Sequence, residues 1–222
     1  NGFVETWYDQ SGNGNNASQL TAAKQPKIVS AGALVTGGLD FDGVDDFLEA
    51  NMTGINAATD LSTFNVITPA AAAAVNSVTM SAWSMGKVTI PRGLALASST
   101  SALSNEKIVM VFDDGTGGRL GSSSYSRASN ERSLFSSFNL NSGTSLFAQG
   151  SSVLLDLSSG MTTSTPSSPD DTGYVTDDIV FLGSLRGTVA IGFTAQKIQE
   201  MIFYPSDQTA NRPAIEANIN NQ

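Results

Sequence analysis

The sequence predicts an all-β fold, an antiparallel two-sheet β-sandwich or jelly roll that ends in one short helix. Short runs of alternating apolar and polar residues recur along the chain, and clusters of Gly, Asn, Asp and Ser separate them. Many short strands between frequent turn signals are typical of sandwiches and jelly rolls. Helix signals are few, and the best of them lies in the C-terminal tail.

The expected strands follow one another along most of the chain. They are predicted at residues 3–8, 26–29, 39–41, 47–50, 78–85, 107–112, 133–139, 144–149, 152–157, 178–182, 188–193 and 196–204. Alternation is cleanest where Ile108, Met110 and Phe112 share one face, and residues 153–157 repeat the pattern. Strands with one polar and one apolar face are typical of antiparallel sheets. Residues 179–182 are apolar on both faces, which predicts a strand in the middle of a sheet.

The segments between these runs carry turn chemistry. Residues 42–46, Asp-Gly-Val-Asp-Asp, form an evident turn because Asp and Gly tolerate unusual dihedral angles and Asp can bond its own backbone. Residues 115–126 and 158–171 are rich in hydroxyl groups, glycine or proline, and we expect exposed loops there.

The tail after residue 205 predicts the helix. Ser206 or Asn211 can act as the N-terminal cap, and Pro213 falls in the first turn, where proline loses no hydrogen bond. Ile215 and Ile219 are four residues apart and therefore share one face of the helix.

Two residue types are missing from the chain, and their absence excludes several kinds of site. The sequence holds no cysteine and no histidine. Disulfides, thiolate metal sites and cysteine nucleophiles are therefore excluded. So are the serine–histidine–aspartate relay and every zinc site that relies on imidazole.

The charge balance disfavours two classes of partner. Eleven basic and twenty acidic residues give a net charge of −9. An acidic protein of this kind is a poor match for nucleic acid or for an anionic membrane surface. No stretch approaches the roughly 18 to 20 apolar residues of a membrane span, so membrane insertion is not expected. Charged residues make up only 14 % of the chain, and such polar, weakly charged surfaces are common on extracellular and virion proteins.

Both ends of the chain resemble one known family. Residues 7–16 run Trp-Tyr-Asp-Gln-Ser-Gly-Asn-Gly-Asn-Asn, and residues 203–208 run Phe-Tyr-Pro-Ser-Asp-Gln ahead of the apolar tail. Together they resemble the catalytic jelly-roll domain of the arabinofuranosidase B family of α-L-arabinofuranosidases. They are also similar to the concanavalin-like, LamG-like modules of phage tail and bacterial surface proteins. The resemblance implies a concanavalin-like jelly roll.

The same resemblance sets the expected domain organisation. We expect residues 1–222 to form a single jelly-roll domain, because no internal repeat or long linker divides the chain. In the family, further strands precede the Tyr-Asp-Gln-Ser-Gly turn, whereas only residues 1–6 precede Trp7 here. This implies that the sequence is the C-terminal part of a longer chain.

The resemblance does not bring the family's catalytic carboxylates with it. A retaining glycosidase needs two carboxyl groups about 5 to 5.5 Å apart. Laying residues 112–114 on the family's Phe-Gly-Asp stretch puts Ile108 at the nucleophile position, with Glu106 two residues earlier. Laying residues 182–183 on the family's Leu-Gly pair puts the acid/base position near Gly187. The family's vicinal disulfide is excluded as well, so we predict no catalytic residue.

Sugar binding without hydrolysis requires only an aromatic platform and a few planar hydrogen-bonding groups. The candidate ligand-binding residues are Trp83, Asp113, Asp114, Arg119 and Tyr125. Trp83 is equally compatible with a place in the core, because apolar residues alternate just before it. Arg119 and Tyr125 lie in the segment that we expect as an exposed loop.

Two acidic turns could hold a metal ion. Asp9, Asp42 and Asp45 are the candidates, because carboxylate oxygens beside glycines can ligate calcium. The alternative is structural: the same carboxylates accept hydrogen bonds from neighbouring amides, and the spacing matches no EF-hand loop. No cofactor other than calcium is expected.

These features favour a non-catalytic carbohydrate-binding or adhesion module at a virion or cell surface, such as part of a phage tail fibre or receptor-binding protein. The expected partners are surface glycans or other subunits of an assembly, including further copies of the chain. One alternative is an arabinofuranosidase-type glycoside hydrolase. Its carboxyl groups would come from Glu106, Asp113, Asp114, Asp177 and Asp178. The other alternative is a purely architectural virion domain.

Overall fold

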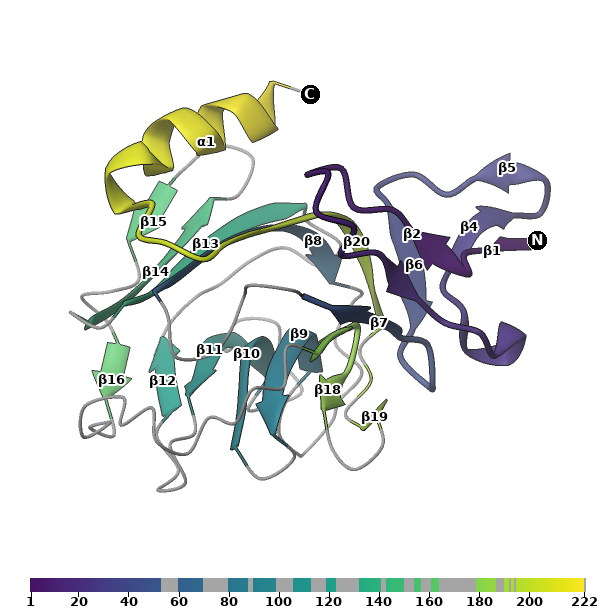
Figure 1. Cartoon of the computed structure of the whole chain (residues 1–222), viewed down its shortest axis with the longest axis horizontal. Helices are drawn as coiled ribbons and strands as arrows, with labels where there is room; N and C mark the ends of the chain where they lie inside the picture. The colour runs from purple at the N-terminus through teal and green to yellow at the C-terminus, as the bar shows by residue number, and fades with distance from the viewer. Residues whose placement is uncertain are drawn as a thin grey trace.

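The structure is a computed structural model of the 222-residue chain. It describes residues 1–52, 60–69, 80–87, 90–98, 106–112, 119–122, 132–140, 143–149, 154–156, 161–163, 179–186, 190–191, 193 and 195–221. Within these ranges the chain forms two layered antiparallel sheets, a small β-hairpin and one α-helix (Figure 1).

The first layer, sheet A, has the strand order β1-β4-β6-β20-β8-β13-β14-β15, with β5 paired to β4. Its strands are β1 (Gly2–Phe3), β4 (Lys27–Ser30), β5 (Ala33–Leu34), β6 (Leu39–Asp42), β8 (Leu61–Pro69), β13 (Ser133–Leu140), β14 (Gly143–Gln149), β15 (Leu154–Asp156) and β20 (Ala195–Tyr204). Strand β20, the last in the chain, lies between β6 and β8 and joins the N-terminal part of the sheet to the rest.

The second layer, sheet B, has the order β16-β12-β11-β10-β9-β17-β7-β3-β2. Its strands are β2 (Thr6–Trp7), β3 (Ala17–Ser18), β7 (Leu48–Asn51), β9 (Met80–Lys87), β10 (Ile90–Ser98), β11 (Glu106–Phe112), β12 (Arg119–Ser122), β16 (Met161–Thr163) and β17 (Ile179–Leu182). The strands β18 (Leu185–Arg186) and β19 (Ala190–Ile191) form a separate hairpin directly after β17.

The main core fills the space between the two sheets, and both sheets contribute to it. Phe41 and Ile67 of sheet A and Leu48, Trp83 and Met85 of sheet B are almost completely buried there. For each sheet, we call the side that faces this core the inner face and the opposite side the outer face. Burial of large apolar side chains from both layers is the main source of the stability of a sandwich.

A second, smaller core lies on the outer face of sheet A. The helix α1 (Arg212–Asn220), preceded by a 3-10 turn (Thr209–Asn211), packs across this face (Figure 1). Ile219 of α1 is buried against Phe64, Val66, Leu134 and Phe138 of sheet A. Among the described residues, no helix has the length and apolar character that crossing a membrane would require.

The structure confirms the predicted fold class, an antiparallel two-sheet sandwich with a short C-terminal helix. The predicted strands at 39–41, 107–112 and 133–139 correspond closely to β6, β11 and β13. Other details of the prediction were wrong. The expected first strand is divided into β1 and β2, and the two expected loops contain β12 and β16. No strand was expected at β8 or β10, both of which lie inside their sheets.

Candidate functional site

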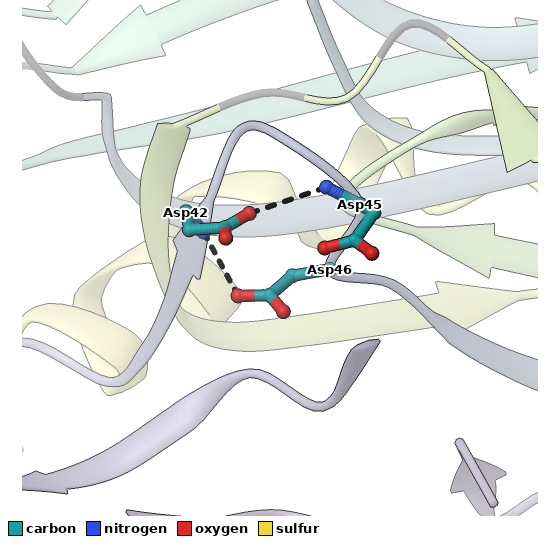
Figure 2. A group of neighbouring side chains, drawn as sticks. All are labelled: Asp42, Asp45 and Asp46. Carbon is teal, nitrogen blue, oxygen red and sulfur yellow. Dashed lines mark hydrogen bonds between the residues drawn. The ribbon is translucent and has the colours of Figure 1, made fainter. Parts of the chain in front are cut away.

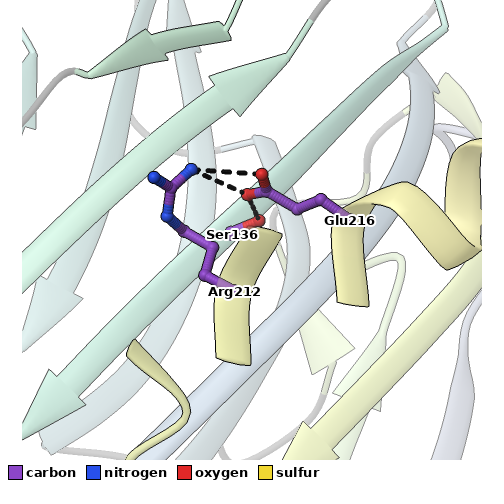
Figure 3. A network of polar contacts seen from close by, with 3 residues as sticks. All are labelled: Ser136, Arg212 and Glu216. Carbon is purple, nitrogen blue, oxygen red and sulfur yellow. Dashed lines mark hydrogen bonds and ion pairs between the residues drawn. The ribbon is translucent and has the colours of Figure 1, made fainter. Parts of the chain in front are cut away.

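The C-terminal helix closes the outer face of sheet A through a polar network as well as through apolar contacts. Glu216 of α1 is only 5 % exposed, and its carboxylate accepts a hydrogen bond from Ser136 Oγ of β13 at 2.7 Å. Arg212 pairs with the same carboxylate at 3.1 Å, one helical turn away (Figure 3). The Arg212 guanidinium also lies over the ring of Phe147, 4.0 Å from its centroid. A buried carboxylate with these partners fixes the helix on the sheet, so this face is occupied by the protein itself.

The outer face of sheet B is therefore the other large surface of the sandwich. Trp83 and Met85 of β9 belong to the inner core, so Ser84 between them takes an outer-face position. The backbone pairing of neighbouring strands identifies the outer-face positions of β10, β11, β12, β17 and β7 in the same way. The resulting row of outer-face positions is Arg119, Val111, Gly93, Ser84, Phe181 and Glu49.

The segment after β17 covers the middle of this row. Gly183 donates its backbone N–H to Ala82 O at 2.9 Å, and Ser84 Oγ donates to Ser184 O at 3.0 Å. Strand β18 then lies against β9 and, to a smaller extent, β10. Ser84 is fully buried as a result. The hairpin divides the outer face into a β10–β12 side and a β17–β7 side, and in the described chain β11 and β12 have their main contacts with sheet neighbours.

An aromatic cluster lies on the β17–β7 side. The ring of Phe181 stacks on Phe47 with 5.5 Å between centroids, and the ring of Phe193 lies 6.3 Å from that of Phe47. Phe47 and Phe193 are partly exposed. No local signal in the sequence predicts this cluster, because its three rings come from separate segments, two of which meet through the pairing of β17 with β7.

The turn from β6 to β7 gathers three carboxylates beside this cluster. One oxygen each from Asp42, Asp45 and Asp46 lies within 4.8 Å of the others, and Figure 2 shows the three groups converging. Asp46 Oδ2 accepts the Asp42 N–H at 3.0 Å, and Asp42 Oδ1 accepts the N–H groups of Val44 and Asp45. The chain turns through Gly43, whose φ of +76° and close approach to the Ala195 backbone leave no room for a side chain.

The electrostatics of this turn reflect its burial. Asp46 is 7 % exposed, and this burial raises the pKa of its carboxyl group to about 6. The negative charges of Asp42 and Asp45 act in the same direction, whereas the hydrogen bond from the Asp42 N–H opposes them. Three converging carboxylates are the donor set that calcium prefers, so Asp42, Asp45 and Asp46 are the residues that could hold such an ion.

Asp9 lies apart from this group of carboxylates and bonds to the residues of its own turn. Its carboxylate accepts hydrogen bonds from Ser11 N, Ser11 Oγ and Asn15 N, at 2.8, 2.8 and 3.0 Å. These bonds, chiefly the one from the Ser11 N–H, lower the pKa of Asp9. The bonds match the structural interpretation of this turn, and Asp9 is not among the three grouped carboxylates of the described residues.

The structure describes two of the five predicted sugar-binding residues, Trp83 and Arg119. Trp83 is 2 % exposed and packs edge-on against Phe203 at 5.1 Å, so its prediction as an aromatic platform is wrong and the core interpretation is right. Arg119 begins β12 and takes an outer-face position on sheet B. Asp113, Asp114 and Tyr125 lie outside the described residues.

The register of sheet B also shows on which face Ile108 lies, the position matched to the family's nucleophile. Ile108 pairs with Leu96, which lies two residues from Leu94, the partner of Trp83. Ile108 therefore takes an inner-face position, and Glu106, two residues away on the same strand, does so too. Gly183 begins the segment that crosses sheet B, while Gly187, Asp177 and Asp178 lie outside the described residues.

Comparisons with known proteins support the fold. No protein-family model matches the sequence, and a search of curated proteins finds no match. Among solved structures, the chain is similar to a GH54 α-L-arabinofuranosidase soaked with a cyclic sulfate inhibitor. The TM-score is 0.61 and the identity 15 %, over 95 % of this chain and 49 % of that chain.

Two further similar structures come from other kinds of protein. The binding domain of botulinum neurotoxin serotype D matches with a TM-score of 0.52 and 9 % identity, over 98 % of this chain and 51 % of that one. Domains LG4-5 of the mouse laminin alpha1 chain match with a TM-score of 0.50 and 12 % identity, over 85 % and 47 %. The chain spans about half the length of these structures. At such low identities the likeness shows the fold alone, which is the predicted concanavalin-like jelly roll.

Proposed function

We propose that this chain is a non-catalytic carbohydrate-binding module and that its ligand lies on the outer face of sheet B. The observation that carries the proposal is the asymmetry of the sandwich, because α1 occupies the outer face of sheet A through Ile219 and Glu216. The other outer face has its strands β10, β11 and β12 beside the β18–β19 hairpin. The face of a sheet of several strands suits an extended sugar chain.

The fold neighbours support a sugar as the ligand class. One solved structure of similar fold is an arabinofuranosidase complexed with arabinofuranosyl-alpha-1,2-xylobiose, with a TM-score of 0.53 and 16 % identity. Another was solved with an inhibitor bound. A fold can host many functions, so these neighbours support the ligand class and leave the ligand itself to experiment.

Binding without hydrolysis is favoured by the position of the carboxylates. A glycosidase needs two carboxyl groups that converge on the same sugar. In this chain Ile108 stands at the expected nucleophile position, and the nearest glutamate, Glu106, takes an inner-face position. The register thus puts Glu106 on the face of β11 opposite to the proposed ligand.

We place the module outside the cell or on a virion, as one jelly-roll domain of a longer tail-fibre, receptor-binding or other surface protein. The low content of charged residues and the absence of cysteine suit that setting. Contacts with other subunits are part of the proposal. Among the described residues, the exposed large apolar side chains are Phe3, Tyr8, Leu20, Leu34 and Val44, which all belong to the N-terminal segment. These exposed apolar side chains also favour the second candidate function, an architectural domain that packs against neighbouring subunits.

The test is a glycan array probed with the full chain, followed by affinity measurements on two matched variants. Ala95 of β10 takes an outer-face position, whereas Ala217 is exposed on α1. Ala95→Gln should weaken binding roughly tenfold by obstructing the ligand, and Ala217→Gln should leave it unchanged. Equal effects of the two substitutions, or no binding to any glycan, would contradict the proposal.

Hydrolysis is tested separately with aryl arabinofuranosides. We expect no release of the aryl group by the wild-type chain. Release that disappears in Glu106→Gln would instead establish the glycoside hydrolase alternative. An absence of glycan binding combined with stable self-association would favour the architectural role.

A further inference from the structure

The chain contains two Asn-Gly pairs, and the structure holds them in different ways. One is Asn1-Gly2 at the start of the sequence, and the other is Asn13-Gly14 in the turn between β2 and β3. Asparagine followed by glycine is prone to deamidation, because glycine has no side chain to hinder the attack of its backbone nitrogen on the asparagine side chain. A folded protein slows this reaction wherever strand pairing or hydrogen bonds fix the two residues.

The first pair is fixed on both sides of the reacting bond. Gly2 belongs to β1 and pairs with Val29 of β4, and a Cβ atom built on Gly2 would lie 3.2 Å from the Val29 side chain. Asn1 Oδ1 accepts the Ala31 N–H at 3.0 Å. The reaction requires the Asn1 side chain to fold back onto the Gly2 nitrogen, so it would have to break this hydrogen bond and disturb the strand pairing.

The second pair lies in an open turn. Asn13 and Gly14 are both exposed, and a Cβ atom built on Gly14 would meet nothing within 4 Å. Within the described chain the Asn13 side chain takes part in no hydrogen bond, and only its backbone N–H is bonded, to Ser11 Oγ at 3.3 Å. The turn is held on either side of this pair, where Asp9 accepts the N–H groups of Ser11 and Asn15. The Asn13 side chain can therefore approach the Gly14 nitrogen without breaking a hydrogen bond of its own.

The Gly14 N–H is restrained only weakly. Of the N–H groups that interact with the Asp9 carboxylate, it makes the smallest contribution. Because Gly14 is exposed, base from the solvent can reach this proton.

We propose that Asn13 is a site of spontaneous deamidation in the folded protein and that the fold protects Asn1 from the same reaction. The Gly14 nitrogen gives its proton to base in the solvent and forms a bond to Asn13 Cγ, while the Cγ–Nδ2 bond breaks and the amide group takes up a proton and leaves as ammonia. Water then opens the cyclic succinimide at either of its two carbonyl carbons, which leaves aspartate or isoaspartate at this position. No electrons are transferred, and water is the co-reactant.

The product changes the turn in two ways. It adds a negative charge to a turn that is built around the Asp9 carboxylate, and isoaspartate also adds one carbon atom to the backbone. The turn follows β2, which lies at the opposite end of sheet B from β12 and β16. The modification is therefore independent of the proposed sugar site.

The experiment incubates the full chain at pH 8 and 37 °C and follows both Asn-Gly peptides by mass spectrometry, with fragmentation that distinguishes isoaspartate from aspartate. In the folded protein, Asn13 should convert roughly tenfold faster than Asn1 or more, which corresponds to a barrier difference of about 1.4 kcal/mol. In guanidinium chloride the contacts of both pairs are lost, and the two rates should become comparable. Equal rates in the folded protein, or an Asn13 that converts only after unfolding, would overturn the proposal.

Two glycine substitutions then locate the reaction. Gly14→Ala places a methyl group beside the attacking nitrogen and should slow the conversion of Asn13 roughly tenfold or more. Gly12→Ala is the matched control, because Gly12 has a φ of +85° against +78° for Gly14, is equally open, and leaves the Asn-Gly pair intact. It should react like the wild type. Equal slowing by the two substitutions would mean that the conformation of the turn sets the rate, and this would contradict attack by the Gly14 nitrogen.

Discussion

Gly183 shows how strongly a single position can depend on the absence of a side chain. It directly follows β17 and has a φ of +82°, a region that favours glycine, and a Cβ atom there would overlap the ring of Phe41. Phe41 is 1 % exposed and cannot move aside within the core. Gly183→Ala should therefore lower the free energy of unfolding by about 2 to 4 kcal/mol. Urea denaturation measures this change.

Gly12 provides a matched control for Gly183. Its φ is +85°, but a Cβ atom at Gly12 would meet nothing within 4 Å. Gly12→Ala should cost only the backbone strain, about 1 to 2 kcal/mol. Similar losses for the two substitutions would mean that the overlap with Phe41 is relieved elsewhere.

Asp46 provides a prediction about pH. Its pKa is about 6 in the folded protein against 3.8 for a free side chain, because burial disfavours the charged form. The folded state therefore holds this proton more tightly, and stability should decrease as the pH rises from about 4 to about 6. Asp46→Asn removes the decrease and keeps an oxygen that can accept the Asp42 N–H. We expect the variant to be about 1 kcal/mol more stable than the wild type at pH 7, allowing for solvent screening.

Asp9→Asn should give the opposite result, which serves as a control for the sign. The pKa of Asp9 is lowered by its hydrogen bonds, so its stabilising effect is present above pH 3.8 and is lost at lower pH. Thermal unfolding at pH 3.5, 5 and 7 measures both variants. A gain in stability for Asp9→Asn at pH 7, or a loss for Asp46→Asn, would contradict this account of the two turns.

Among the strands, those with one apolar and one polar face were the easiest to predict from the sequence. The apolar residues of β11 alternate with others, and the pattern was visible in the sequence. Strand β8 is different because both of its faces are buried, one in the main core and one under α1. Two of its polar side chains are bonded inside the protein: Thr63 Oγ1 lies 2.6 Å from Ser137 Oγ, and Asn65 donates to Thr63. Because neither face of β8 is exposed to solvent, its sequence does not alternate between polar and apolar residues.

Strand β10 was missed for another reason. Pro91 and Gly93 are unfavourable in strands, and sequence alone does not tell that both take outer-face positions. The carboxyl-terminal helix could be predicted because Pro213 and the pair Ile215 and Ile219 are local signals. Its partners Ser136 and Phe147 could not, since they lie on strands far away in the sequence.

The helix α1 is predicted to stabilise the fold mainly through its apolar face. Ile219 is 2 % exposed and packs against Phe64 and Phe138, so Ile219→Ala should lower the free energy of unfolding by about 3 kcal/mol. Leu34→Ala removes a side chain of similar size from an exposed position and should change stability by about 0.5 kcal/mol or less. Urea denaturation of both variants provides the comparison. Equal effects would mean that α1 is not firmly packed on sheet A.

At the scale of the whole molecule, the sandwich has one outer face covered by its own helix and one that carries the proposed site. The two layers could be predicted from the sequence, from the alternating strands and from the motifs at residues 7–16 and 203–208. It could not predict which residues share the outer face of sheet B, because Arg119, Gly93 and Phe181 become neighbours only through the pairing of five strands. The mismatch with the arabinofuranosidase pattern at Ile108 was visible in the sequence, whereas the inner-face position of Glu106 required the register.

Amide chemical-shift mapping shows where on the protein a sugar binds, and here the expected place is the outer face of sheet B. The measurement titrates the isotope-labelled full chain with the oligosaccharide selected on the array and follows every assigned backbone amide. We expect shift changes on β10, β11 and β12, none on α1, and an oligosaccharide that is recovered unchanged. Changes concentrated on α1 and sheet A, or cleavage of the sugar during the titration, would contradict the claim.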